Sequence, residues 1–209
     1  HGPVGPLSAS VCVESGLAVD HAPLIFPTSD DQQAGLVGGG AVDAGQVAVV
    51  LGNSAVVNSS AASPSAGGTL DVMRLNWGPY LWMRCYNNGA QFLNKIVGKN
   101  PDWTKLEGAA RQIPPGCDGT MVAPFVFPEP SLGVLHPDFR WAPAQPSDKG
   151  TRFRAALEAL AYLIALGVEQ HEAAGQQITR ITVSGGIARS RLMCEILASA
   201  LNHPLELLV

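Results

Sequence analysis

Two glycine-bearing turns, far apart in the chain, limit what this sequence can fold into. The first occupies residues 51–55 (Leu-Gly-Asn-Ser-Ala) and follows an apolar run at 46–50. The second occupies 183–190 (Val-Ser-Gly-Gly-Ile-Ala-Arg-Ser), follows an apolar run at 178–183 and opens into an amphipathic run at 190–201. Glycine has no Cβ, so the backbone N–H groups of such turns can approach a phosphate closely. A strand, a glycine turn and a helix N-terminus in succession predict an anion site, although each turn alone also suits an ordinary chain reversal.

Composition narrows the class of protein. With 209 residues, 46% of them hydrophobic and 14% charged, the chain can bury a sizeable core as one large domain or two small ones. Its formal charge of −4 and scattered Lys and Arg argue against a broad nucleic-acid surface. The chain has four cysteines, Cys12, Cys85, Cys117 and Cys194, and no two of them form a C-x-x-C pair. This pattern indicates a reduced, cytoplasmic protein without structural zinc.

The two ends of the sequence look like cuts through a longer chain. The first residue is His1 rather than Met, in a Pro- and Gly-rich segment, and the apolar strand-like run 204–209 ends the sequence without a following element. We therefore expect truncation at both ends. The longest apolar stretch, 155–168, contains Glu158 and is too short to span a bilayer, so we expect no membrane association.

Hydrophobic periodicity predicts strands and helices in alternation. We expect helices over 8–16, 31–38, 80–97, 103–113, 151–174 and 190–201. We expect strands over 22–26, 121–127, 178–183 and 204–209, and a two-stranded hairpin over 46–58. Residues 128–147, rich in proline, are expected to form a long functional flap or packed loop.

Several motifs, taken in order, carry a resemblance to a known family. They are residues 31–35 (Asp-Gln-Gln-Ala-Gly), 45–47 leading to 51–54, 87–93, the helix 152–175, and 183–192. This series resembles the C-terminal domain of FGGY-family carbohydrate kinases, nearest the xylulokinase-like branch. The resemblance implies an α/β fold of the actin-like ATPase (ribonuclease H-like) type, with a central mixed sheet flanked by helices. On this interpretation residues 1–209 are a single C-terminal domain whose N-terminal sugar-binding domain is absent.

The resemblance also implies a catalytic carboxylate. Phosphoryl transfer needs the attacking hydroxyl to be oriented and deprotonated, and one carboxylate can do both. Asp31 matches the general base of the family, and Gln32 would help to position the sugar. The alternative for Asp31 is a helix cap, and we assign the cap to the adjacent Asp30 instead.

The glycine turns match the nucleotide-binding turns of the family. Gly52, Asn53 and Ser54 match a turn that faces the terminal phosphates of ATP. Asn53 replaces a threonine there and Ala55 a glycine, so an amide side chain stands where the family has a hydroxyl.

In the second turn, Gly185 and Gly186 match residues that let the ribose and phosphates approach. Ser190 or Arg191 would lie near the adenine, or serve as a plain N-cap and a solvated arginine.

Other conspicuous side chains have simpler interpretations. Glu129, His136 and Asp138 lack the spacing of a metal cluster, and Pro130 stands where the family has an arginine. Trp77 and its aromatic neighbours suit a core better than a sugar-stacking platform.

Two functions follow for the chain. The first is the C-terminal half of a carbohydrate kinase that uses ATP and Mg²⁺ to phosphorylate a sugar or polyol of the ketopentose type, inactive as an isolated fragment. On the resemblance, the main Mg²⁺-binding acid lies in the absent domain, so no metal ligand is assigned here. The second is a non-catalytic nucleotide-binding or interaction domain. The expected partners are the small substrates and the missing N-terminal domain, and the resemblance leaves a homodimer open.

Overall fold

A computed structural model describes residues 2–27, 29–98 and 100–208, so the two chain ends, His1 and Val209, lie outside the described residues. The chain divides into two compact units, residues 1–34 and 35–209. Among the described residues, no helix has the length and hydropathy needed to cross a bilayer. The four cysteines are all free thiols.

The N-terminal unit is small and has little interior. Strand β1 (Gly5–Pro6) pairs antiparallel with β2 (Leu24–Ile25), and α1 (Ala9–Glu14) and a 3-10 turn (Val19–His21) lie between them in sequence. Among its described residues only Cys12 and Gln33 are buried. The helix predicted over 8–16 and the strand predicted over 22–26 are both present in shorter form.

Helix α2 (Asp31–Gly38) begins where the sequence predicted, and Asp30 is its cap. The Asp30 carboxylate accepts hydrogen bonds from the backbone N–H of Gln32 at 2.9 Å and of Gln33 at 3.0 Å. Burial raises the pKa of Asp30, but these bonds and the Gln33 side chain outweigh burial and lower it overall. Asp31, exposed at the first helical position, is not the residue that caps α2.

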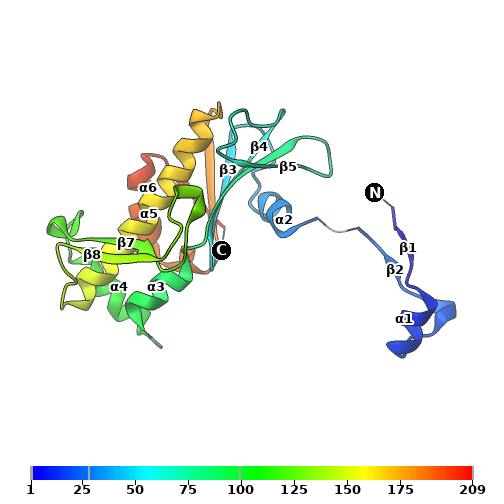
Figure 1. Ribbon diagram of the computed structural model, residues 1–209, viewed down its shortest axis with the longest axis horizontal. Coiled ribbons are helices and arrows are strands. Elements are labelled where there is room, and N and C mark those ends of the chain that lie inside the picture. Colours follow the sequence, from blue (N-terminus) through cyan, green and yellow to red (C-terminus); the bar gives the residue numbers. More distant parts are fainter. Residues whose placement is uncertain (1, 28, 99, 209) are drawn as a thin grey trace. The chain divides into compact units, whose positions relative to one another are not determined.

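The larger unit is built on a mixed sheet of six strands in the order β10-β9-β3-β4-β6-β5. Three of them, β3, β4 and β5, are labelled in Figure 1. The strands are β3 (Gln46–Leu51), β4 (Ala55–Ala61), β5 (Asp71–Arg74), β6 (Tyr80–Tyr86), β9 (Arg180–Ser184) and β10 (Leu205–Leu207). Strands β10, β9 and β3 are parallel, whereas β3, β4, β6 and β5 pair antiparallel. The predicted hairpin over 46–58 is the β3–β4 pair.

The helix predicted over 80–97 is wrong in its first half. Residues 80–86 form β6, which pairs with β4 from Ala61 opposite Tyr80 to Ala55 opposite Tyr86. The side chains alternate between the faces of the sheet, because Leu81 lies in one hydrophobic cluster and Tyr86 in the other. The apolar residues of this segment also fit a helical period, and its pairing with β4 determines that it forms a strand instead. Only α3 (Ala90–Val97) is helical.

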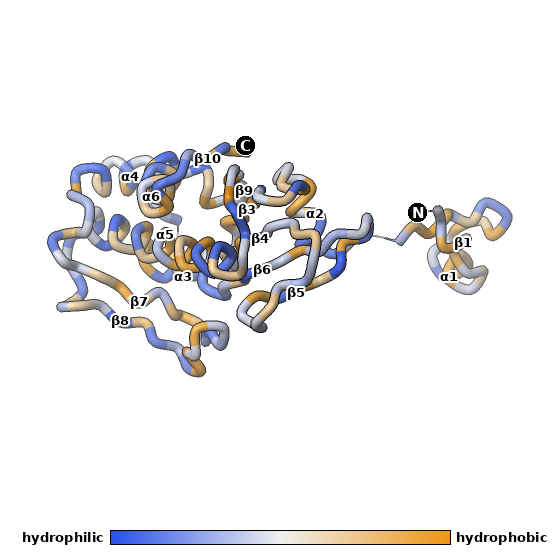
Figure 2. The backbone as a smooth tube through the Cα atoms, turned by 90° about the horizontal axis from the view of Figure 1, so that it is seen from above, coloured by the Kyte–Doolittle hydropathy of each residue, from blue (hydrophilic) through white to orange (hydrophobic). Residues whose placement is uncertain are grey.

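Helix α5 (Lys149–Ala173) lies at the centre of the main core. It packs against β4, β6, α3, α4 (Trp103–Arg111), α6 (Arg191–Leu201) and β7 (Met121–Phe125) (Figure 1). Hydrophobic and hydrophilic stretches interleave along these helices (Figure 2), as expected for helices that cover one face of a sheet. Asp102 caps α4, accepting the Lys105 N–H at 3.0 Å.

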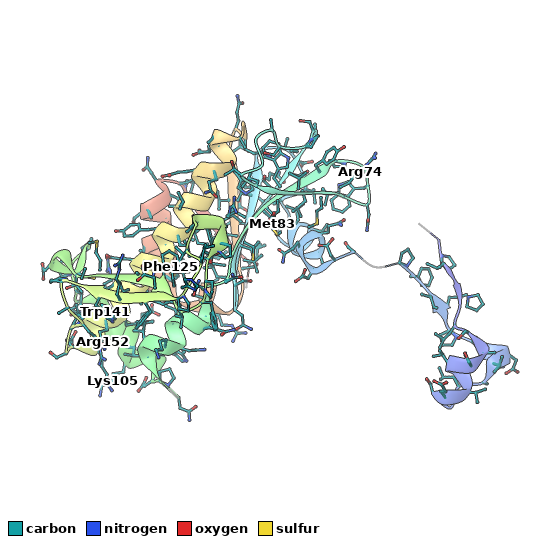
Figure 3. All side chains as sticks on the ribbon, in the orientation of Figure 1. Arg74, Met83, Lys105, Phe125, Trp141 and Arg152 are labelled. Carbon is teal, nitrogen blue, oxygen red and sulfur yellow. The ribbon has the colours of Figure 1, made fainter. Side chains whose placement is uncertain are left out.

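The opposite face of the sheet carries a smaller hydrophobic cluster: Leu36, Ala41, Ala48, Leu75 and Leu81. Met83 of β6 packs against this cluster and is labelled in Figure 3. The central strands are therefore apolar on both faces, as is usual for a sheet covered on both sides.

The proline-rich excursion 128–147 is not a structureless loop. It contains a 3-10 turn (Pro130–Leu132) and β8 (Asp138–Ala142), which pairs antiparallel with β7. Phe125 of β7 and Trp141 of β8, both labelled in Figure 3, pack against the main core. Part of this segment forms a hairpin because β7 pairs with it, although its many prolines do not favour a strand.

A buried histidine joins the end of α5 to β4. His171 is fully buried, with Nδ1 2.7 Å from the Ser59 hydroxyl and Nε2 3.2 Å from the Val57 carbonyl oxygen. The Gln176 amide also donates to Ser59 Oγ at 3.1 Å. These contacts suit a neutral imidazole that donates from Nε2 and accepts at Nδ1.

We expect this histidine to make the unit sensitive to acid. Burial lowers the pKa of His171 to about 4. The unfolded chain takes up the proton near pH 6.5. The free energy of unfolding should therefore be undiminished above about pH 6.5 and fall by roughly 3 kcal/mol as the pH drops towards 4. Urea unfolding across this range measures the effect. His171→Gln should flatten the slope, whereas His136→Gln, at an exposed position, should leave it unchanged; equal slopes in all three proteins would contradict the assignment.

Candidate functional site

The first glycine turn joins β3 to β4 and is held by the start of α3. The Gly52 N–H donates to the Ser54 carbonyl at 2.9 Å, which closes the turn. The N–H groups of Gly89 and Ala90 donate to the carbonyls of Asn53 and Gly52 at 3.0 and 2.9 Å. Neither Gly52 nor Asn53 has a positive φ, so a left-handed backbone is not the reason for glycine here.

Gly89 is the glycine that this turn requires. A Cβ added to it would lie 2.5 Å from the Gly52 carbonyl oxygen and 2.6 Å from that of Asn53. Real Cβ atoms do not come that close, so only glycine lets α3 begin against the turn. Gly89 lies in the stretch 87–93, which resembles the kinase family, but no role was assigned to this glycine from the sequence. Its signal was an Asn-Asn-Gly run directly before a helix.

The segment before α3 is fixed by a buried carboxylate. Glu129 is 1% exposed and accepts hydrogen bonds from the Asn87 N–H at 2.7 Å, Asn88 Nδ2 at 3.2 Å and the Ser131 hydroxyl at 3.0 Å. Within the described residues no cluster of three His, Cys, Asp or Glu side chains could hold a metal ion. Glu129 is a structural residue in this arrangement.

The second glycine turn lies beside the first. Strands β3 and β9 are parallel neighbours, with Val50 opposite Ser184, so both turns follow the carboxyl ends of adjacent strands. A Cβ on Gly185 would collide with the backbone of Leu51, and the φ of Gly185 is +99°. By contrast, nothing lies within 4 Å of a Cβ on Gly186. Of the two predicted glycines, Gly185 holds the turns together and Gly186 faces open space.

Both turns line one cavity of about 600 Å³. Its walls come from the turns and from α3, α4, α5 and the start of α6, and are formed by Leu51, Gly52, Asn53, Ala90, Leu93, Asn94, Trp103, Glu107, Phe153, Leu157, Gly186, Ile187, Arg189 and Ser190. Gly52, Asn53, Gly186 and Ser190, four of the residues predicted to bind the nucleotide, thus line the same cavity. Ser54 and Gly185 belong to the turns but do not line the cavity. A cavity beyond the carboxyl ends of parallel strands is a common ligand position in α/β folds.

The N-terminus of α6 already holds a carboxylate of this chain. Ser190 caps the helix, accepting the Met193 N–H at 3.2 Å, and its hydroxyl donates to Glu107 Oε2 at 3.0 Å. Glu107 Oε1 accepts the Leu192 N–H at 3.0 Å. Glu107 therefore occupies the position at this helix start where an anion would bind, and the anion site expected from the second glycine turn stays a prediction. Arg191 is outside the cavity lining and pairs with Glu195 at 3.0 Å.

The predicted catalytic residues lie in another part of the chain. Asp31 and Gln32 belong to the first turn of α2, in the N-terminal unit, whereas the cavity is lined by residues of the larger unit. Capping by Asp30 leaves the Asp31 carboxylate outside the hydrogen bonds that hold the helix start. The roles of Asp31 and Gln32 remain predictions.

The larger unit is an α/β domain with a mixed sheet between two hydrophobic layers, and it places two glycine turns at one cavity. Residues 141–208 match the model of the FGGY family of carbohydrate kinases, C-terminal domain, and this range contains two of the motif stretches on which the resemblance rests, 152–175 and 183–192. No curated protein sequence matches the chain.

Solved kinase structures share the fold. The xylulose kinase from Rhodospirillum rubrum matches with a TM-score of 0.79 and 22% identity, over 98% of this chain and 43% of that chain. The ligand-bound xylulose kinase and the gluconate kinase from Lactobacillus acidophilus match with TM-scores of 0.83 and 0.80, each at 16% identity over 99% of this chain and 43% of that chain. The chain has the actin-like ATPase fold of these kinases and spans 43% of their length.

The two adjacent glycines should respond differently to the same substitution. Gly185→Ala should destabilise the protein by roughly 2 kcal/mol or more, because it adds a backbone collision to an unfavourable φ. Gly186→Ala should stay within about 0.5 kcal/mol of the native protein, because its Cβ enters open space. Urea unfolding of the two variants is the measurement, and similar losses in both would refute the packing role of Gly185.

Proposed function

We propose that this chain is the C-terminal half of an ATP-dependent carbohydrate kinase and that the cavity between the two turns binds the nucleotide. The convergence of both turns on one cavity carries the proposal. The turns are separated by more than a hundred residues in sequence, yet Gly52, Asn53 and Gly186 line the same space. The match of residues 141–208 to the kinase family supports it.

The charges around the cavity suggest how the nucleotide would lie. Phosphate oxygens would be repelled by the Glu107 carboxylate, so we place them against the part of the lining that the two turns form, Gly52, Asn53 and Gly186. Backbone N–H groups of glycine turns can neutralise charge on a phosphoryl group without a basic patch. The base and ribose would then lie towards Ser190, Glu107 and Trp103.

Asp31 would supply the general base. It would accept the proton of the attacking sugar hydroxyl while Gln32 orients the sugar. Mg²⁺ bound with ATP would neutralise charge on the phosphates. The one carboxylate of the described lining, Glu107, is held by Ser190 and Leu192, so we do not assign it as a metal ligand. We propose a ketopentose-type sugar or polyol as substrate, a cytoplasmic location, and a companion N-terminal domain that completes the cleft.

A second function is favoured by one observation. The residues that line the cavity all belong to the larger unit, so this unit by itself supplies the surface that we assign to the nucleotide. The replacement of a family threonine by Asn53 is compatible with this alternative. In the full-length gene product, sugar-dependent release of ADP that is lost in Asp31→Asn would favour the kinase, whereas nucleotide binding with no such release would favour the binding domain.

Nucleotide binding can be tested by calorimetric titration with Mg·ATP and Mg·ADP. Gly186→Val should abolish binding, because its side chain enters the cavity without a clash in the protein itself. Asp31→Ala should bind as the native chain does, since a general base acts on the sugar. Gly108→Val is the matched control, at another glycine whose Cβ would meet nothing within 4 Å but which lies outside the lining. Absence of binding in the native chain, or equal binding in Gly186→Val, would overturn the proposed site.

A further inference from the structure

We propose that Trp103 and Glu107 form a base-selecting subsite, in which the Trp103 indole stacks on the nucleobase and the Glu107 carboxylate accepts a hydrogen bond from its exocyclic amino group. This subsite rests on the proposed nucleotide site, and its two residues would make that site prefer adenine to a 6-keto purine.

Trp103 offers a flat, half-exposed aromatic surface at the cavity. It is the first residue of α4, is 50% exposed and lines the cavity. Its ring is supported from one side by buried Phe153, with ring centroids 6.1 Å apart and an interplanar angle of 54°. A large apolar ring that stays half in water beside a cavity gains free energy when a planar ligand covers it.

Trp103 borders a second cavity as well. Trp103 and Asn94 also line a second, neighbouring cavity of about 740 Å³, at the connection between α3 and α4. The Trp103 indole therefore borders open space in both cavities. A base lying against it would have room for its full ring system.

Glu107 lies on the same face of α4, because residues four apart in a helix are neighbours. Oε1 accepts from the Leu192 N–H and from Arg111 Nη2 at 3.2 Å, and Oε2 accepts from Ser190 Oγ at 3.0 Å. These bonds fix the carboxylate, whose side chain remains 25% exposed. A carboxylate oxygen can accept more than one hydrogen bond, so Oε2 can take another donor.

The chemistry of a carboxylate gives the subsite its selectivity. An ionised carboxylate only accepts hydrogen bonds, so a carboxylate that faces position 6 of the purine attracts the amino group of adenine and repels the keto oxygen of hypoxanthine. A site with a fixed polar partner discriminates well against a ligand that leaves this partner unpaired.

The stacking role is tested by calorimetric titration of Mg·ATP into the native chain, Trp103→Ala and Trp77→Ala. Trp77 is 47% exposed and lies outside the cavity lining, so its variant controls for loss of an exposed indole. Trp103→Ala should bind about tenfold or more weakly, as expected for loss of base stacking, and Trp77→Ala should bind as the native chain does. Trp103→Phe should recover most of the affinity. Equal affinity of native chain and Trp103→Ala would overturn the stacking role while leaving the nucleotide site in place.

The amino-group contact is tested with ATP and ITP, which differ at position 6 of the purine. The native chain should bind Mg·ATP about tenfold more tightly than Mg·ITP. Glu107→Gln, checked by its melting temperature, should narrow this ratio because an amide can also donate to a keto group. A purely structural role for Glu107 would weaken both nucleotides alike and leave the ratio unchanged. Equal affinities in the native chain would overturn the contact, whereas binding of neither nucleotide would overturn the proposed function itself.

Discussion

The larger unit depends on the close parallel pairing of β3 with β9. Gly185 lies against the backbone of Leu51 with no space for a side chain, and this contact sets the distance between the two turns. Because α6 starts immediately after the second turn, the same contact places Ser190 and the helix start at the cavity. The cavity is therefore a consequence of how two strand ends meet.

Much of this arrangement could be read from the sequence, because its signals are local. The long run with one wide apolar face at 151–174 predicted α5, and Ser190, with its short polar side chain, was a candidate cap at the start of α6. The two glycine turns were located correctly and do line one cavity. The ordered series of motifs resembled the FGGY kinase family, whose C-terminal domain model matches residues 141–208.

The remainder depends on contacts between distant residues, which periodicity does not encode. Residues 80–86 became a strand because β4 is available to pair with them. Gly185 and Gly186 look alike in sequence, yet only the position of Leu51 separates a packing glycine from an open one. The Glu107 carboxylate bonds to Ser190 at the start of α6, 83 residues away in sequence, and no pattern of spacing in the sequence predicts this contact.

The spread of the cavity walls along the chain has a consequence for folding. Leu51 and Ser190 are far apart in the sequence of the larger unit, and the helices α3, α4 and α5, which lie between them in sequence, supply other parts of the cavity wall. Such non-local contacts form late in folding, after the loops between them have closed. The cavity thus exists only when the whole unit is folded. Any ligand that fills it is thermodynamically linked to global unfolding rather than to the opening of a single loop.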